Sequence, residues 1–255
     1  MKIQIVSDTH EDLSRFNVHK NVDLIIHAGD FSKSNTSSIT HIEDFINKCS
    51  KSNTEYAFVL GNHDYYGYSL ENSLLVKECI DKGYNLIDIN KPFIFKDHTF
   101  IGGLFGTDFR LPFDVYNDIE LTKAYCKYNI MDFYRIYKDN SLDKLITPED
   151  YIKLFNKSLE YINSYRNKEN IVVVTHFPLS SICIDPKYKN NPLNPYFIND
   201  IDLEGFKTVI SGHTHLTNKF KKDNTNIYIN ASGYTSNYYN QVECLDFDDN
   251  FIIEV

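Results

Sequence analysis

Strand-like apolar runs alternate with amphipathic segments along most of the chain. Residues 2–6, 22–27, 56–60 and 171–174 are short apolar runs, and each is followed at once by polar residues. Between two of these runs, apolar side chains recur at helical spacing and predict an amphipathic helix: Ile39, Ile42, Phe45, Ile46 and Cys49. Alternating strands and helices of this kind are typical of an α/β fold.

Further elements follow in the second half of the chain. Residues 70–80 predict a helix, and residues 93–95 and 99–101 predict a pair of strands. Thr147, Pro148 and the acid at position 150 are a helix start, because a hydroxyl caps the first turn and proline fits its first position. After Ile210 the pattern predicts strands alone, most clearly at 226–230 and 242–246.

Two segments have no simple periodicity. Residues 108–140 are rich in Tyr and Phe, and we interpret them as loops with short helices. We expect residues from about 108 to 165 to form a helical, aromatic-rich insertion that borders the functional site. Four prolines make the segment after 176 a long irregular loop: Pro178, Pro186, Pro192 and Pro195.

Length and composition restrict the class of protein. The chain has 255 residues, of which 42% are hydrophobic and 24% charged, and it shows no linker or repeat, so we expect one domain over 1–255. No apolar run approaches the roughly 18 residues of a membrane helix, and the first residues, acidic at Asp8 and without a long apolar run, lead us to expect no signal peptide. The five cysteines form no CxxC pair, which argues against a disulfide framework or a thiolate zinc site. We expect a cytoplasmic protein.

Charge narrows the possible partners. Lys and Arg number 26 against 35 Asp and Glu, a net charge of −9. Such a protein offers little counter-charge to extended nucleic acid or to an anionic membrane surface. We therefore expect neither as a partner, although a local positive site can still bind an anion.

Polar clusters stand just beyond the carboxyl ends of the predicted strands. Ligand sites in open α/β sheets form at such ends, so clusters on neighbouring strands are expected to converge. Their residues are Asp8 and His10, Asp30, Asn62 and His63, His176, and His213 and His215.

The chemistry of these clusters suits a pair of divalent metal ions. Asp8 and His10 are two residues apart, so in extended backbone both side chains point toward one ion, and the pair of histidines at 213 and 215 repeats this spacing. Asp30 follows a glycine and has two oxygens with which to bridge two ions. The set holds nitrogen and oxygen but no sulfur, which favours Mn, Fe, Zn, Co or Ni over Ca or Mg. Taken singly, Asp8, Asp30 and Asn62 also suit plain turn formation.

Five blocks together resemble the signature of the calcineurin-like metallophosphoesterases. In chain order they are Asp8-x-His10, Gly29-Asp30, Gly61-Asn62-His63-Asp64, His176 and Gly212-His213-x-His215. Each block alone is common, but their order and spacing agree with the family over residues 8–215. The resemblance implies a four-layer α/β/β/α sandwich of two mixed sheets flanked by helices.

The resemblance also implies roles for these residues. One metal would be held by Asp8, His10 and His215, and a second by Asn62, His176 and His213, with Asp30 bridging them. The two ions would be Mn, Fe or Zn. A hydroxide held between them would attack the phosphorus atom of the substrate. His63 would be the general acid that protonates the leaving oxygen, or else a histidine that only supports a ligand. Asp64 would orient His63 or cap the following turn.

The chain departs from one branch of this family and is closer to another. Protein Ser/Thr phosphatases continue their GD block as GDxxDRG, whereas here Phe31-Ser32-Lys33-Ser34-Asn35 follow Asp30, which disfavours that activity. The stretches at 106–110, 175–178, 185–194 and 230–234 are similar to a small bacterial cytoplasmic branch with unsettled substrates.

Some residues outside the blocks are candidates for substrate contact. Arg110 has a guanidinium fork that suits a phosphate, and the alternative is an ion pair with Asp108 or Asp114. The aromatic residues of the insertion either stack on a nucleobase or pack among themselves. They are Tyr116, Tyr125, Tyr128, Phe133, Tyr134 and Tyr137.

The leading interpretation is a hydrolase of a small or nucleotide-like phosphomonoester or phosphodiester. The first alternative is a nuclease acting on a short single strand, since the charge disfavours longer nucleic acid. The second is a protein-binding scaffold that has lost catalysis. A scaffold would be expected to lack a ligand or the histidine at 63, and here all eight positions are filled.

Overall fold

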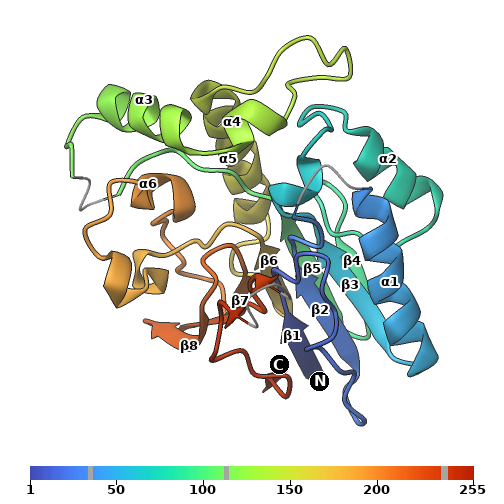
Figure 1. Cartoon of the computed structure of the whole chain (residues 1–255). Coiled ribbons are helices and arrows are strands. Elements are labelled where there is room, and N and C mark those ends of the chain that lie inside the picture. The colour runs from blue at the N-terminus through green and yellow to red at the C-terminus, as the bar shows by residue number, and fades with distance from the viewer. Residues whose placement is uncertain (34–36, 112–114, 237–240) are drawn as a thin grey trace.

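Two mixed β-sheets lie face to face in the computed structural model, which describes residues 1–33, 37–111, 115–236 and 241–255 (Figure 1). The first sheet has the order β12-β1-β2-β3. Strands β1 (Lys2–Val6), β2 (Leu24–Ala28) and β3 (Glu55–Val59) are parallel, and β12 (Ile252–Glu254) is antiparallel to β1. This pairing brings the two chain ends together at the amino end of β1.

The second sheet has six strands in the order β4-β5-β6-β7-β9-β8. Its four middle strands are parallel, and the two edge strands are antiparallel to their neighbours. The strands are β4 (Phe93–Phe95), β5 (His98–Gly103), β6 (Ile171–Thr175), β7 (Thr208–Ser211), β8 (Thr217–Lys222) and β9 (Thr225–Asn230). A separate ribbon joins β10 (Thr235–Ser236) and β11 (Gln241–Val242).

Helices cover the outer faces of both sheets. On the first sheet these are α1 (Ser38–Lys51) and α2 (Leu74–Asp81), and on the second α5 (Pro148–Asn163) (Figure 1). Further helical elements lie near the carboxyl ends of the strands. They are α3 (Ile119–Asn129), α4 (Asp132–Arg135), α6 (Asn194–Phe197) and the 3-10 turns η1 (His63–Tyr65), η2 (Ser181–Cys183) and η3 (Pro186–Tyr188).

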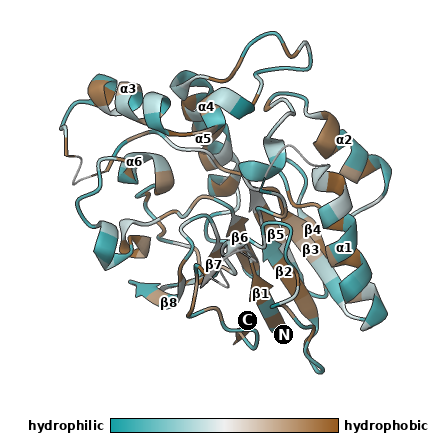
Figure 2. Cartoon of the chain, viewed as in Figure 1, coloured by the Kyte–Doolittle hydropathy of each residue, from teal (hydrophilic) through white to brown (hydrophobic). Residues whose placement is uncertain are grey.

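The alternation of side chains along each strand explains the four layers. In β2, Ile26 belongs to the core between the sheets, whereas the adjacent Ile25 belongs to the core that includes Phe45 of α1. In β6, Val174 lies between the sheets and Val173 on the helix side. Apolar colour accordingly concentrates on the strands in Figure 2. The predicted fold class, two mixed sheets flanked by helices, is confirmed.

Several local predictions agree with the structure. The helix predicted around Phe45 is α1, and the helix predicted at 70–80 is α2, which begins only at Leu74. The start of α5 is as expected, because the Asp150 carboxylate accepts the backbone N–H of Thr147 at 2.9 Å. The region 108–165 contains α3, α4 and α5.

The strand predicted at 242–246 is wrong beyond Val242. Strand β11 ends at Val242. The next two residues contact His215 and do not continue the strand: Glu243 accepts a hydrogen bond from the His215 ring, and Cys244 donates one to the His215 carbonyl. Within the described ranges, no helix combines the length and apolar character needed to cross a membrane.

Because Ile26 lies in the core between the two sheets, we expect Ile26→Ala to lower the stability of the protein strongly. Ile26 is fully buried, and its truncation should lower the free energy of unfolding by about 2–5 kcal/mol, measured by urea denaturation. The control is Ile94→Ala on edge strand β4, where the side chain is 68% exposed and the expected change is about 0.5 kcal/mol or less. Equal losses in the two variants would contradict the assignment of the core.

Candidate metal centre

The five predicted clusters meet where the carboxyl ends of the two sheets adjoin. Backbone hydrogen bonds tie the loops together: the N–H of Asp8 donates to the carbonyl of Gly29 at 2.9 Å, and the N–H of Gly212 to that of His176 at 3.1 Å. The N–H of Ser232 donates to the carbonyl of Ser7 at 2.9 Å, which joins the two sheets. The expected convergence of polar side chains therefore has a rigid backbone frame.

At five of the predicted ligands the backbone is left-handed, not extended. The prediction that Asp8 and His10, and then His213 and His215, reach one ion from extended backbone is therefore wrong in its geometry. Such angles cost non-glycine residues on the order of 1–3 kcal/mol each and are concentrated at functional sites. The φ values are 52° at Asp8, 45° at His10, 60° at Asp30, 70° at His213 and 47° at His215.

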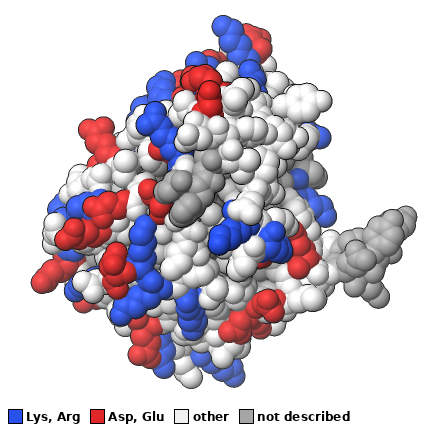
Figure 3. All heavy atoms as spheres, turned by 90° about the vertical axis from the view of Figure 1, so that its left-hand side faces the viewer, with Lys and Arg blue, Asp and Glu red and all other residues white. Residues whose placement is uncertain are grey.

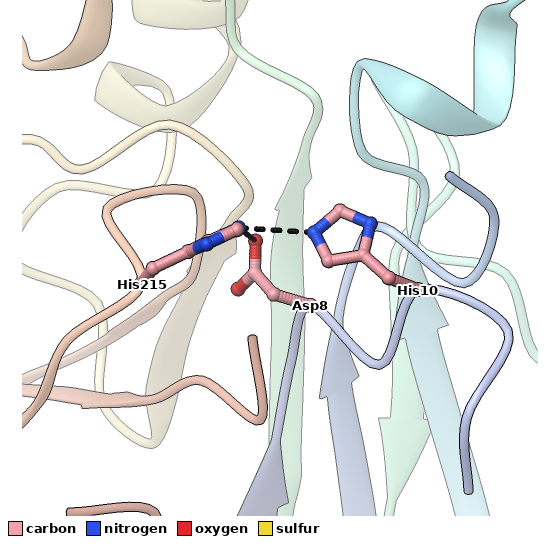
Figure 4. A group of neighbouring side chains, drawn as sticks. All are labelled: Asp8, His10 and His215. Carbon is pink, nitrogen blue, oxygen red and sulfur yellow. Dashed lines mark hydrogen bonds and ion pairs between the residues drawn. The ribbon is translucent and has the colours of Figure 1, made fainter. Parts of the chain in front are cut away.

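The first group of side chains consists of Asp8, His10 and His215 (Figure 4). Their ligand atoms lie within 4.8 Å of one another, with 2.9 Å between the Nε2 atoms of the two histidines. The Nδ1 of His10 donates to the carbonyl of Ser32 at 3.0 Å, and the Nδ1 of His215 donates to Glu243 at 2.6 Å. Both rings are thus held with Nε2 facing the site, as metal-binding histidines are.

The electrostatic environment of the His10 and His215 rings favours a cation between them. Burial lowers the pKa of His10 well below its usual value. Burial acts in the same direction on His215, but the carboxylates of Glu243 and Asp8 outweigh it and raise the pKa of that histidine. The neighbouring carboxylates thus favour a positive charge at the two facing nitrogens, which a metal ion would supply.

The second group consists of Asp30, His176 and His213. The Nδ1 of His176 donates to the carbonyl of Ala28 at 2.8 Å, and its Nε2 lies 3.0 Å from Oδ1 of Asn62. Burial opposes a charge on His176, but Asp30 and Asp8 raise its pKa to about 9. The Nε2 of His213 is buried and has no hydrogen-bond partner among the described residues. This second set of nitrogen and oxygen donors also fits a transition-metal ion.

Asp30 lies between the two groups. One of its carboxylate oxygens is 3.9 Å from Nε2 of His10, and the other is 3.4 Å from Nε2 of His176. Although burial opposes ionisation, His176 and His63 hold the pKa of Asp30 well below its usual range. Asp30 is therefore an ionised carboxylate that faces both groups.

His63 lies at the open side of the site and is partly exposed. Its backbone N–H donates to Oδ1 of Asp30 at 2.9 Å, and its Nδ1 donates to the carbonyl of Lys33 at 3.3 Å. Its Nε2 is 3.2 Å from the hydroxyl of Tyr234 and thereby faces the cavity that both residues line.

Asp64 contacts backbone groups. Its carboxylate accepts the N–H groups of Gly61, Asp30 and Ser32 at 2.9–3.0 Å. These contacts tie the loop after β2 to the loop after β3, which is a different role from either of the two considered from the sequence. Burial and the neighbouring Asp30 raise the pKa of Asp64 to about 7.

Histidines outside the predicted set have structural surroundings. His27 is buried and stacked on Phe31, and burial lowers its pKa. Its Nδ1 accepts the N–H of Gly29 at 3.2 Å, so its Nε2 donates to Thr9 at 3.1 Å. His27 thereby supports the turn before Asp30 without joining the site.

A cavity of about 470 Å³ opens beside the two groups. One wall comes from the segment between α3 and α4, and the opposite wall from the loop around η3 and α6. The lining combines apolar and polar side chains, among them Ile130, Met131, Ile184, Lys187, Tyr188, Asn191 and Phe197.

Arg110 is exposed and is not among the residues that line this cavity. Its backbone N–H donates to Asp108 at 3.0 Å, whereas Asp114 lies outside the described residues. A phosphate contact of Arg110 stays a prediction. Of the aromatic residues in the insertion, Phe133 packs in the core against Tyr151, and Tyr116 packs against Tyr125.

Three residues near the site were not assigned a role from the sequence. Tyr234 stacks on His10 with 4.1 Å between ring centres, Glu243 holds His215, and Asp132 accepts a hydrogen bond from Asn62. Tyr234 is the last residue of the stretch 230–234, already noted for its resemblance to one branch, which is a usable signal. A lone carboxylate such as Asp132 or Glu243 carries none.

Comparisons with known proteins agree with this geometry. A family model described as calcineurin-like phosphoesterase matches residues 1–216. An uncharacterised protein of Acanthamoeba polyphaga mimivirus is 29% identical over 230 residues, which are 81% of this chain and 79% of that protein.

Two solved structures match this chain, and the first of them has a similar fold. A phosphopantetheinyl hydrolase from Mycobacterium tuberculosis has a TM-score of 0.64 and 15% identity, with 91% of this chain and 89% of that chain covered. A dimetal phosphatase from Danio rerio has a TM-score of 0.48 and 12% identity, with 90% and 86% covered.

The close approach of two loops predicts that Gly61 tolerates no side chain. A Cβ there would lie 2.1 Å from Oδ1 of Asp30, so Gly61→Ala should displace Asp30 and weaken Mn²⁺ binding about 10-fold or more, measured by isothermal titration calorimetry. The control is Gly83→Ala, where a Cβ meets open space and a positive φ adds only backbone strain. Unchanged Mn²⁺ binding in Gly61→Ala would show that Asp30 is not a ligand.

Proposed function

Because the chain belongs to the calcineurin-like phosphoesterase family and is therefore a phosphoester hydrolase, we propose that it cleaves a small phosphomonoester or phosphodiester with the help of two divalent metal ions. One observation carries this proposal: two groups of side chains that could hold a metal ion meet at the Asp30 carboxylate, which belongs to the second group and also faces His10 of the first.

The proposed ligands follow these groups. Asp8, His10 and His215 hold one ion, and His176, His213 and Asn62 hold the other, with Asp30 shared. Mn, Fe or Zn is the expected metal, because the donors are imidazole, carboxylate and amide groups. When bound, such a pair of ions supplies charge that stabilises the phosphate oxygens and activates a water molecule for attack.

His63 is proposed as the general acid. In the structure its Nε2 contacts the hydroxyl of Tyr234 and faces the cavity. A substrate oxygen replacing this hydroxyl would receive the proton from Nε2, while the Nδ1 contact to the Lys33 carbonyl keeps the ring oriented. The bond from the His63 backbone N–H to Asp30 fixes the distance of the acid from the proposed ions.

The surroundings of the site favour a small substrate. The cavity of about 470 Å³ has the size of a small-molecule site, and its walls are mostly apolar and neutral polar residues. On the face shown in Figure 3, among the residues drawn in colour, basic and acidic side chains are interspersed without a continuous basic stripe. Extended nucleic acid would need such a stripe to neutralise its phosphates.

The intact set of residues favours catalysis over a scaffold role. All seven proposed ligands and His63 lie around one site, and the left-handed backbone at five of them has a cost that a scaffold has no reason to keep.

Hydrolysis of model esters tests the proposed function. Protein reconstituted with Mn²⁺ should cleave p-nitrophenyl phosphate or bis(p-nitrophenyl) phosphate, which is measured by the release of p-nitrophenol. Excess chelator should abolish this activity. The ester that is cleaved faster identifies a monoesterase or a diesterase. Failure to cleave either ester with two ions verified as bound would argue against a general phosphoesterase.

Replacement of His63 tests the acid role. His63→Ala should lower kcat about 10²–10⁴-fold because the leaving oxygen loses its proton donor, while two metal ions remain bound. The control is His98→Ala at the start of β5, which should retain full activity. Loss of a metal ion in His63→Ala would instead identify His63 as a ligand.

A further inference from the structure

A buried carboxylate next to the site has only neutral hydrogen-bond donors as its described partners. Asp132 is 1% exposed and begins α4, in the segment between α3 and α5. Its Oδ1 accepts from Nδ2 of Asn62 and from the hydroxyl of Tyr66, both at 2.9 Å. Its Oδ2 accepts from the hydroxyls of Tyr151 and Tyr196. We refer to these five residues as the Asp132 cluster.

Asp132 decides which end of the Asn62 amide faces the proposed metal centre. An amide has a donor end and an acceptor end, and an ionised carboxylate only accepts. Asp132 therefore requires the NH₂ of Asn62 on its own side, which leaves Oδ1 of Asn62 facing Nε2 of His176 at 3.0 Å. Only this oxygen can bind a metal ion, because an amide NH₂ has no lone pair to offer.

The same carboxylate supports other parts of the site. The ring of Tyr66 lies against that of His63, with 4.5 Å between centroids, and the ring of Tyr196 lies 5.6 Å from that of His213. Burial and the charge of Asp132 raise the pKa of both tyrosines, so their hydroxyls stay protonated and continue to donate. The cluster is thus a fixed wall behind one side of the site.

We propose that Asp132 is a positioning residue that fixes Asn62 as an oxygen ligand of the second metal ion. This inference rests on the proposed function, because it requires Asn62 to be a ligand. It extends the metal centre to a residue outside the family signature, and it couples α4 to the chemistry of the site.

Three variants, each titrated with Mn²⁺ by calorimetry, test this role. Asp132→Leu removes the acceptor and keeps a side chain branched at Cγ, so Asn62 is free to turn, and one of the two Mn²⁺ sites should weaken about 10- to 100-fold. Asp132→Asn retains an amide oxygen that can accept from Asn62, while its NH₂ faces the tyrosine hydroxyls, which can rotate to accept it. This conservative variant should bind both ions within about threefold of the original protein.

The matched control is Tyr151→Phe. It removes a donor from the same carboxylate but touches neither Asn62 nor the cavity, so it should lower the melting temperature and leave both Mn²⁺ affinities unchanged. If Asp132→Leu does not fold, Asp132→Ser replaces it, because its hydroxyl is too short to reach Asn62 and leaves room for water beside the tyrosines.

The outcomes separate the two levels of the argument. Weakening of one site in Asp132→Leu or Asp132→Ser, with both sites retained in Asp132→Asn and Tyr151→Phe, supports the inference. Unchanged binding in all variants overturns it, as does equal weakening in Tyr151→Phe, which would make the cluster merely structural. Absence of Mn²⁺ binding by the original protein would instead refute the proposed function itself.

Discussion

The position of Asp30 is the constraint on which the rest of the site depends. The loop after β3 passes so close that Gly61 has no space for a Cβ, and three backbone N–H groups from the two loops converge on Asp64. Asp30 is thereby fixed between His10 and His176, and its carboxylate also accepts the N–H of His63. The other proposed ligands are arranged around this carboxylate, which faces His10 of the first group and His176 of the second.

The concentration of buried titratable groups gives the site its chemistry. Several histidines and carboxylates lie within a few ångströms of one another and have almost no contact with water. Burial lowers the pKa of His10, whereas carboxylates raise the pKa values of His176 and His215. Two divalent ions would compete with protons for these groups and neutralise the carboxylates, which would turn this part of an acidic protein into a binding site for a phosphate ester.

Much of the fold and of the candidate site could be predicted because both depend on local sequence signals. The apolar runs that predicted β1, β2, β3 and β6 also located the carboxyl ends of these strands. The polar residues just after those ends are among the ones that the structure brings together. The left-handed backbone at Asp8 and His10 was not predictable, because periodicity arguments assume regular strands and these residues lie in turns beyond them. Asp132 and Glu243 were also missed, since their roles arise from tertiary contacts with Asn62 and His215 and leave no local pattern.

Anomalous X-ray diffraction from crystals saturated with Mn²⁺ tests the central claim most directly, because it locates the ions without requiring a substrate. The proposed ligand assignment predicts two anomalous peaks on either side of Asp30, one beside Asp8, His10 and His215 and the other beside Asn62, His176 and His213. A single peak, or peaks that do not contact Asp30, in protein shown to be saturated would contradict it.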